Sequence, residues 1–91
     1  MIRADAPKKV LWMDSEIEFL RAHAGFLEAR GFTVEKSSTL AGALDLLKNC
    51  PYDLALLDEQ TLGKEGASTV GRIRAACGEH VPLVLVTKND E

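Results

Sequence analysis

The sequence has few cysteines and no long apolar run. Its two cysteines, Cys50 and Cys77, stand in no metal-binding or redox spacing, so we interpret both as ordinary small thiols. No stretch approaches the roughly 20 apolar residues of a membrane-spanning helix. Residues 1–7 form a polar leader that lacks the apolar segment of a secretory signal. We therefore expect a cytoplasmic chain that has no membrane contact.

The sequence also lacks a strong charge of one sign and the common nucleotide-binding motifs. Its formal net charge is -3, and the basic residues are scattered among acidic ones, so no basic stripe could follow a phosphate backbone. We expect no direct nucleic-acid binding. The chain has no G-x-G-x-x-G, no P-loop, no G-x-S-x-G and no second aspartate two residues after Asp14. These absences argue against an enzyme with a nucleotide cofactor, a serine hydrolase or an aspartate-nucleophile enzyme.

The apolar residues that are present predict one domain. They make up 46% of the 91 residues, which suffices for one core and is too little for two, so we expect a single domain over residues 1–91. Short apolar or alternating runs predict four strands, at residues 8–13, 32–36, 54–57 and 83–86. Apolar residues at helical spacing predict three intervening helices, at residues 16–30, 40–47 and 70–77.

The order of these elements predicts the fold class. Strands and helices alternate as β-α-β-α-β-α-β, and most strands are continuously apolar, as in a parallel sheet that is covered on both faces. Right-handed crossovers then produce an open, doubly wound α/β sheet. Gly31 and Gly78 are expected to end helices, and Ser15 to begin the first. The N-cap of the second helix is expected among Ser37, Ser38 and Thr39.

Polar residues follow three of the four predicted strands. Asp14 follows the first strand, Asp58 the third and Thr87 the fourth. Ligands of open α/β sheets bind beyond the carboxyl ends of the strands, where the strand order reverses. Two carboxylates that repel each other there are stabilised by a hard divalent cation such as Mg²⁺. With such a cation in place, Asp58 could attack phosphorus and form an acyl phosphate.

Four segments resemble the receiver domains of bacterial response regulators. The first strand and its acidic end, KVLWMDSE, and the third strand, YDLALLD, are similar to the family's metal-binding and phospho-acceptor strands. Gly66 matches the glycine of the loop after the phospho-acceptor, and residues 82–87 match the fourth strand with its switch hydroxyl. Each motif is weak alone, but together they cover nearly the whole chain in register. The resemblance implies a flavodoxin-like sheet that lacks the last strand and helices of a complete receiver.

The resemblance also implies roles for individual residues. Asp58 would be phosphorylated by a histidine kinase or a phosphotransfer protein. Asp14, Asp58 and the backbone carbonyl of Gln60 would bind Mg²⁺, and Thr87 would contact the phosphoryl group. The chain would then be a signalling module of a two-component system.

The sequence departs from the family pattern at several positions. Ser15 stands where the family usually has a second metal-binding acid, so Ser15 is a weak candidate ligand and metal affinity should be lower. Leu62 replaces a usual proline, and Lys88 replaces the small residue after the switch hydroxyl. The chain also ends before the family's phosphoryl-binding lysine, for which Lys88 is no assured substitute. These departures keep open an alternative, a pseudo-receiver that binds proteins without cycling phosphate.

Three further expectations concern the remainder of the chain. His23 and His80 lack metal-binding neighbours in sequence, and we expect both at the surface. Trp12 is expected in the core or in the layer next to it. The topology of the family that the chain resembles implies an open edge at the fourth strand and a first helix alone on its face, and these predict self-association or strand exchange.

Overall fold

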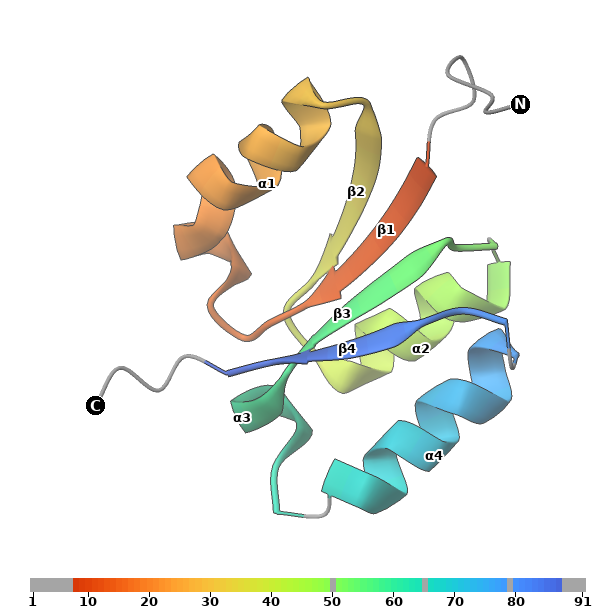
Figure 1. Cartoon of the computed structure of the whole chain (residues 1–91). Coiled ribbons are helices and arrows are strands. Elements are labelled where there is room, and N and C mark those ends of the chain that lie inside the picture. The colour runs from red at the N-terminus through yellow and green to blue at the C-terminus, as the bar shows by residue number, and fades with distance from the viewer. Residues whose placement is uncertain (1–7, 50, 65, 79, 88–91) are drawn as a thin grey trace.

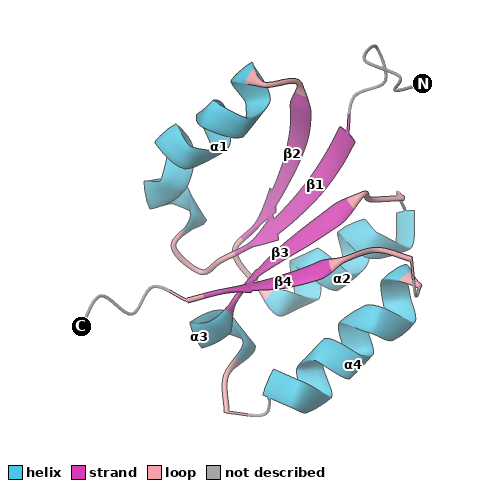
Figure 2. Ribbon diagram, in the orientation of Figure 1, coloured by secondary structure: helices cyan, strands magenta, loops and turns pink. Residues whose placement is uncertain are grey.

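The structure, a computed structural model, describes residues 8–49, 51–64, 66–78 and 80–87. Its described part contains a four-stranded parallel sheet in the order β2-β1-β3-β4 (Figures 1 and 2). The strands are β1 Lys8–Met13, β2 Phe32–Ser37, β3 Leu54–Asp58 and β4 Leu83–Val86. The four predicted strands and the predicted doubly wound, flavodoxin-like α/β class are confirmed.

The helices follow the prediction with three differences: the first helix is divided, a short helix is added, and the last helix begins at Gly66 instead of residue 70. They are the 3-10 helix η1 Ile17–Leu20 and the α-helices α1 Arg21–Ala29, α2 Leu40–Asn49, α3 Glu59–Leu62 and α4 Gly66–Cys77. The single helix predicted over residues 16–30 is thus divided into a 3-10 turn and an α-helix, because the backbone of Leu20 leaves helical geometry (φ -107°, ψ 23°). The short helix α3 was not predicted.

The helix ends show which capping predictions hold. The Thr39 hydroxyl accepts a hydrogen bond from the Gly42 N–H at 3.0 Å, as an N-cap residue does. Gly31 and Gly78 have φ of 95° and 89°, the left-handed conformation expected after a helix. The prediction that Ser15 caps the first helix is wrong. That helical segment starts after Glu16, and it has no side-chain cap.

The sheet separates two apolar clusters. Because side chains alternate along a strand, Leu11 and Met13 of β1 face α2 and α4, whereas Trp12 faces α1. The larger cluster joins β1 and β3 to α2, α3 and α4; its buried members are Leu11, Met13, Ala43, Leu47, Tyr52, Ala55, Leu57, Leu62, Ile73 and Val81. The smaller cluster lies under α1 and contains Trp12, Ile17, Ala24 and Val34. Trp12 is therefore in the core, as predicted.

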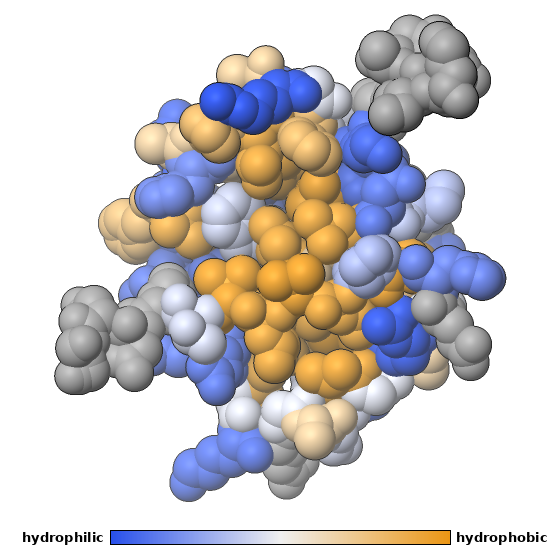
Figure 3. Space-filling model, in the orientation of Figure 1, coloured by the Kyte–Doolittle hydropathy of each residue, from blue (hydrophilic) through white to orange (hydrophobic). Residues whose placement is uncertain are grey.

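Part of the sheet face that carries α1 is left uncovered by the described residues. In β3 and β4, the side chains on this face are aligned as the pair Leu56 and Val84, with Val86 further along β4. Leu56 and Val86 are half-buried, and Val84 is 43% exposed. Figure 3 shows the resulting apolar surface across the middle of the molecule, beside α1. Within the described ranges, no helix is long and apolar enough to cross a lipid bilayer.

The strand order fixes the location of the candidate site. From β1 the chain passes to β2 on one side, and it later adds β3 and β4 on the other side (Figure 1). The strand order therefore reverses between β1 and β3. The carboxyl ends of these two neighbouring strands form the position where an open α/β sheet binds its ligands.

Candidate functional site at the ends of β1 and β3

Two buried carboxylates lie at this position. Met13 of β1 is aligned with Leu57 of β3, so the next residues, Asp14 and Asp58, are adjacent across the two strands. Neighbouring strands are about 4.8 Å apart. Both aspartates have 0% exposure, although a carboxylate is rarely buried without polar contacts. The structure thus brings together the two acids that the sequence singled out.

Backbone contacts hold Asp14 at the start of η1. Its N–H donates to the Ser37 carbonyl oxygen at 2.9 Å, which ties the end of β1 to the end of β2. Its carboxylate Oδ1 accepts the Glu16 N–H at 2.8 Å, and its carbonyl oxygen accepts the Ile17 N–H at 2.9 Å. The Asp14 carboxylate is therefore oriented by the turn that follows β1.

Asp58 is the N-cap residue of α3. Its backbone is still extended (φ -71°, ψ 125°), and its side chain accepts a hydrogen bond from the Thr61 N–H. The accepting atom is Oδ2, at 3.0 Å from the Thr61 nitrogen. The Thr61 hydroxyl donates to the same oxygen at 2.6 Å. One oxygen of the Asp58 carboxylate therefore receives two hydrogen bonds from one residue.

Thr61 also connects Asp58 to the loop after β1. Its Oγ1 accepts the Ser15 N–H at 2.9 Å. The same hydroxyl thus bridges the Asp58 carboxylate and the residue next to Asp14. Sequence analysis missed Thr61, because nothing in its local pattern indicates a contact to a residue 46 positions away.

The remaining predicted site residues lie around the acidic pair. Asp58 is aligned with Val86, so Thr87 follows directly at the same edge of the sheet, and it is exposed. Gln60 is exposed in α3, two residues after Asp58, and Ser15 is exposed directly after Asp14. The structure therefore gathers all five predicted residues near the carboxyl ends of β1, β3 and β4.

The donor chemistry of this site fits a magnesium ion better than a soft metal. Mg²⁺ binds through one or two carboxylates and a few other oxygens and retains several waters. Asp14, Asp58 and the carbonyl of Gln60 offer such oxygens. Among the described residues, no group of three or more His, Cys, Asp and Glu side chains could hold a metal. His23 and His80 are both exposed, as predicted.

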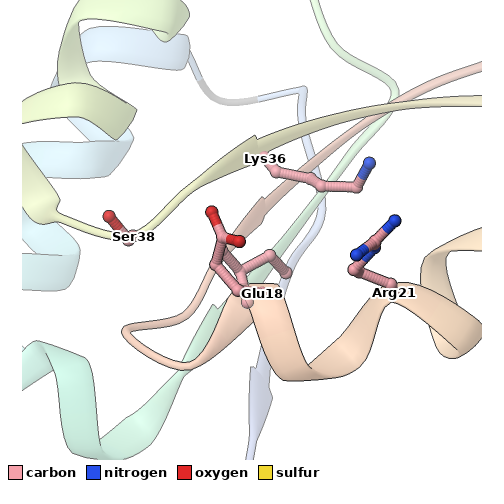
Figure 4. A pocket seen from close by; sticks show the side chains of 5 residues that line it. Glu18, Arg21, Lys36 and Ser38 are labelled. Carbon is pink, nitrogen blue, oxygen red and sulfur yellow. The ribbon is translucent and has the colours of Figure 1, made fainter.

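A separate cavity of about 320 Å³ lies between η1, α1 and β2. It is lined by Ile17, Glu18, Arg21, Lys36 and Ser38 (Figure 4). Its lining includes neither Asp14 nor Asp58, although the Ile17 N–H at its wall donates to the Asp14 carbonyl oxygen. The cavity mixes two basic side chains with one acidic side chain, so its charge favours no single class of ligand.

Comparisons with known proteins identify the fold. A scan against family models and a search among curated proteins found no match. Among solved structures, a response regulator from Burkholderia pseudomallei with a phosphorylated aspartic acid and a calcium ion has a TM-score of 0.78 and 20% identity over 92% of this chain. The response regulator TrrA from Thermotoga maritima in complex with Mg²⁺-BeF has a TM-score of 0.75 and 24% identity over 91% of this chain. The MaeR response regulator bound to beryllium trifluoride has a TM-score of 0.72 and 27% identity over 92%.

The matches differ in how much of the known protein they include. This chain spans 49% of the Burkholderia pseudomallei protein, 71% of TrrA and 70% of MaeR. The four parallel strands in the order 2-1-3-4 agree with these matches. The chain therefore has the receiver fold, and it is shorter than the complete receivers that it matches.

Proposed function

We propose that this chain is a phospho-acceptor receiver domain of two-component signalling and that Asp58 is the residue that is phosphorylated. The observation that carries the proposal is the pairing of Asp58 with Asp14 at the point where the strand order of a receiver fold reverses. The fold alone does not require two buried carboxylates at this point, whereas phosphoryl transfer to an aspartate does use them. The similar structures from Burkholderia pseudomallei and Thermotoga maritima, with a phosphorylated aspartic acid and with Mg²⁺-BeF, support it.

The proposed reaction assigns a role to each residue. A carboxylate oxygen of Asp58 forms a bond to phosphorus while the P–N bond of a phosphohistidine breaks, and the electron pair of that bond returns to the imidazole nitrogen. Asp14, Asp58 and the Gln60 carbonyl would hold Mg²⁺, which neutralises phosphoryl charge. The Thr87 hydroxyl would donate a hydrogen bond to a phosphoryl oxygen. The donor would be a histidine kinase or a phosphotransfer protein.

Intact-mass spectrometry after incubation with acetyl phosphate and Mg²⁺ tests this proposal. The P–O bond to acetate then breaks in place of the P–N bond, and acetate leaves with the electron pair. We expect the mass of one phosphoryl group on the natural sequence, and none on Asp58→Asn or after chelation of Mg²⁺. An equal gain on Asp58→Asn would overturn the assignment of Asp58.

A pseudo-receiver that binds partner proteins without phosphorylation is the second candidate. It is favoured by Ser15, which supplies a neutral hydroxyl where a further carboxylate would strengthen cation binding. A folded chain that gains no phosphoryl mass, and whose Thr61→Val and Ser15→Asp variants also gain none, would support this candidate over the first.

We also propose that two copies of the chain associate through β4. This strand is an edge of the sheet, and its sequence LVLV contains no charged residue. The opposite edge strand, β2, contains Glu35 and Lys36, which oppose pairing with another strand. A twofold axis would pair β4 with its own copy and bury Val84 and Leu85, which are 43% and 52% exposed.

A further inference from the structure

The Thr61 hydroxyl occupies a position on Asp58 that the proposed chemistry needs. A carboxylate that both binds a cation and attacks phosphorus uses one oxygen for each task. Oδ2 of Asp58 already accepts the Thr61 N–H at 3.0 Å and the Thr61 O–H at 2.6 Å. A carboxylate oxygen has about two in-plane lone-pair sites, so these two donors fill Oδ2. A cation can bind Oδ2 in the plane only after one donor has left.

The hydroxyl is the donor that can leave. The Thr61 N–H belongs to the backbone of α3, and its bond to Asp58 is the N-cap interaction of that helix. The hydroxyl, by contrast, can release its proton from Asp58 by rotation about one side-chain bond. Because Oγ1 also accepts the Ser15 N–H at 2.9 Å, its release would loosen the contact between α3 and the loop that contains Ser15.

The burial of Asp58 points in the same direction. Its side chain has 0% exposure, so a cation or a phosphoryl donor reaches it only when neighbouring groups move. Thr61 is half-buried, and its hydroxyl connects Asp58, at the end of β3, to the loop that follows Asp14 at the end of β1. Movement of Thr61 would therefore free a lone pair on Asp58 Oδ2, and it would also change how a cation or a phosphoryl donor reaches the acidic pair.

We infer that Oδ2 is the oxygen of Asp58 that binds the divalent cation, that the Thr61 hydroxyl competes with the cation for this oxygen, and that it holds the site closed until a cation displaces it. This inference deepens the proposed function and rests on it for the identity of the ligand. Thr61 is a positioning residue in this account, since it acts through Asp58. In the closed state it substitutes a neutral donor for the cation, and it offsets part of the cost of burying the carboxylate.

Magnesium titration of variants tests the inference. Thr61→Val keeps the shape of the side chain and removes the donor, so we expect it to bind Mg²⁺ about tenfold more tightly than the natural sequence, the change produced by one charge-assisted hydrogen bond that no longer has to be broken. Thr61→Ser restores the hydroxyl, and its affinity should return to that of the natural sequence. Calorimetry measures the affinity, and circular dichroism verifies that each variant is folded.

The amide of Ser15 provides a second readout that a general loss of stability would not reproduce. In the natural sequence, Mg²⁺ should shift the Ser15 and Thr61 amide resonances together, because one hydroxyl contacts both. In folded Thr61→Val, the Ser15 amide should be close to its Mg²⁺-bound position before any metal is added.

The outcomes separate this inference from the proposed function. Tighter Mg²⁺ binding by Thr61→Val, with affinity restored in Thr61→Ser, supports competition even if acetyl phosphate transfers no phosphoryl group. Equal or weaker binding by folded Thr61→Val overturns it, even if Asp58 is phosphorylated normally. If Thr61→Ser binds Mg²⁺ as tightly as Thr61→Val, the effect does not come from the hydroxyl and the inference is also overturned.

Discussion

At the scale of single residues, the site combines predicted acids with an unpredicted hydroxyl. Asp14 and Asp58 could be identified from the sequence because each ends an apolar run, and parallel strands bring such ends to one edge. Thr61 could not be identified in this way. Its proposed role depends on the contact between α3 and the loop after β1, which no local pattern records.

The neutral Ser15 provides a gain-of-function prediction. This side chain is exposed and directly follows Asp14, so Ser15→Asp adds a negative charge at the acidic pair without entering the core. We expect Mg²⁺ affinity to rise about tenfold, because a third nearby carboxylate attracts a hard cation even with solvent screening.

Ser15→Asn is the matched control for this change, because it has nearly the same size and no charge. Calorimetric titration should give it the affinity of the natural sequence. If Ser15→Asp leaves Mg²⁺ affinity unchanged, position 15 is too far from the cation, and the proposed arrangement of ligands is incorrect.

At the scale of elements, the sequence predicted the strands more accurately than the helices. The strands are short apolar or alternating runs that end at turn residues or acids, so their bounds can be read from the order of residues in the sequence. The division of the first helix at Leu20 was not visible, because Ile17, Leu20 and Ala24 have the spacing of one continuous helix. Helix α3 has only four residues, too few for a period, and it forms where the Asp58 side chain caps its first turn by accepting the Thr61 N–H.

Two glycines in different helices should respond in opposite ways to the same substitution. In Gly42→Ala, the new Cβ would lie 2.6 Å from Ser37 Oγ, a short and buried side chain. Relief of that clash requires the Ser37 hydroxyl to leave the Thr39 carbonyl oxygen, to which it now donates at 2.7 Å. We expect Gly42→Ala to lower the free energy of unfolding by about 1 kcal/mol, since leaving the buried Ser37 hydroxyl unpaired costs about 2 kcal/mol and alanine's better helix propensity offsets only about 1 kcal/mol of this.

Gly71 in α4 is the matched control. It has no atom within 4 Å of an added Cβ, and it is exposed. Gly71→Ala should therefore raise the free energy of unfolding by about 0.5 to 1 kcal/mol. Urea denaturation measures both values. A stabilising Gly42→Ala would show that the Ser37 side chain moves at no cost.

At the scale of the whole molecule, the main exposed feature is an apolar sheet face next to an uncharged edge (Figure 3). The expectation that α1 lies on one face, with α2 and α4 on the other, agrees with the two clusters. The self-association expected from this surface is still a prediction. The surface that drives association can be identified by substitution, because the exposed apolar residues lie on different elements.

Charge at β4 should weaken association of the chain. Val84→Lys places an ammonium group on the uncovered face and charges the edge strand, so the dimer dissociation constant should rise at least tenfold. Phe19→Lys is the control, because Phe19 is an exposed apolar residue, at 85%, that belongs to η1 and not to β4. Sedimentation velocity over a range of concentrations distinguishes them. A chain that is monomeric at every concentration, or a Phe19→Lys effect as large as that of Val84→Lys, would argue against pairing through β4.

The central claim is that Asp58 forms the acyl phosphate, and chemical trapping tests it most directly. Borohydride reduces an aspartyl phosphate to homoserine, so the modified position can be located by peptide mass spectrometry after treatment with acetyl phosphate and Mg²⁺. We predict homoserine at position 58 and at no other aspartate, with none when Mg²⁺ is chelated. Homoserine at position 14, or its absence from a folded chain that binds Mg²⁺, would contradict the account.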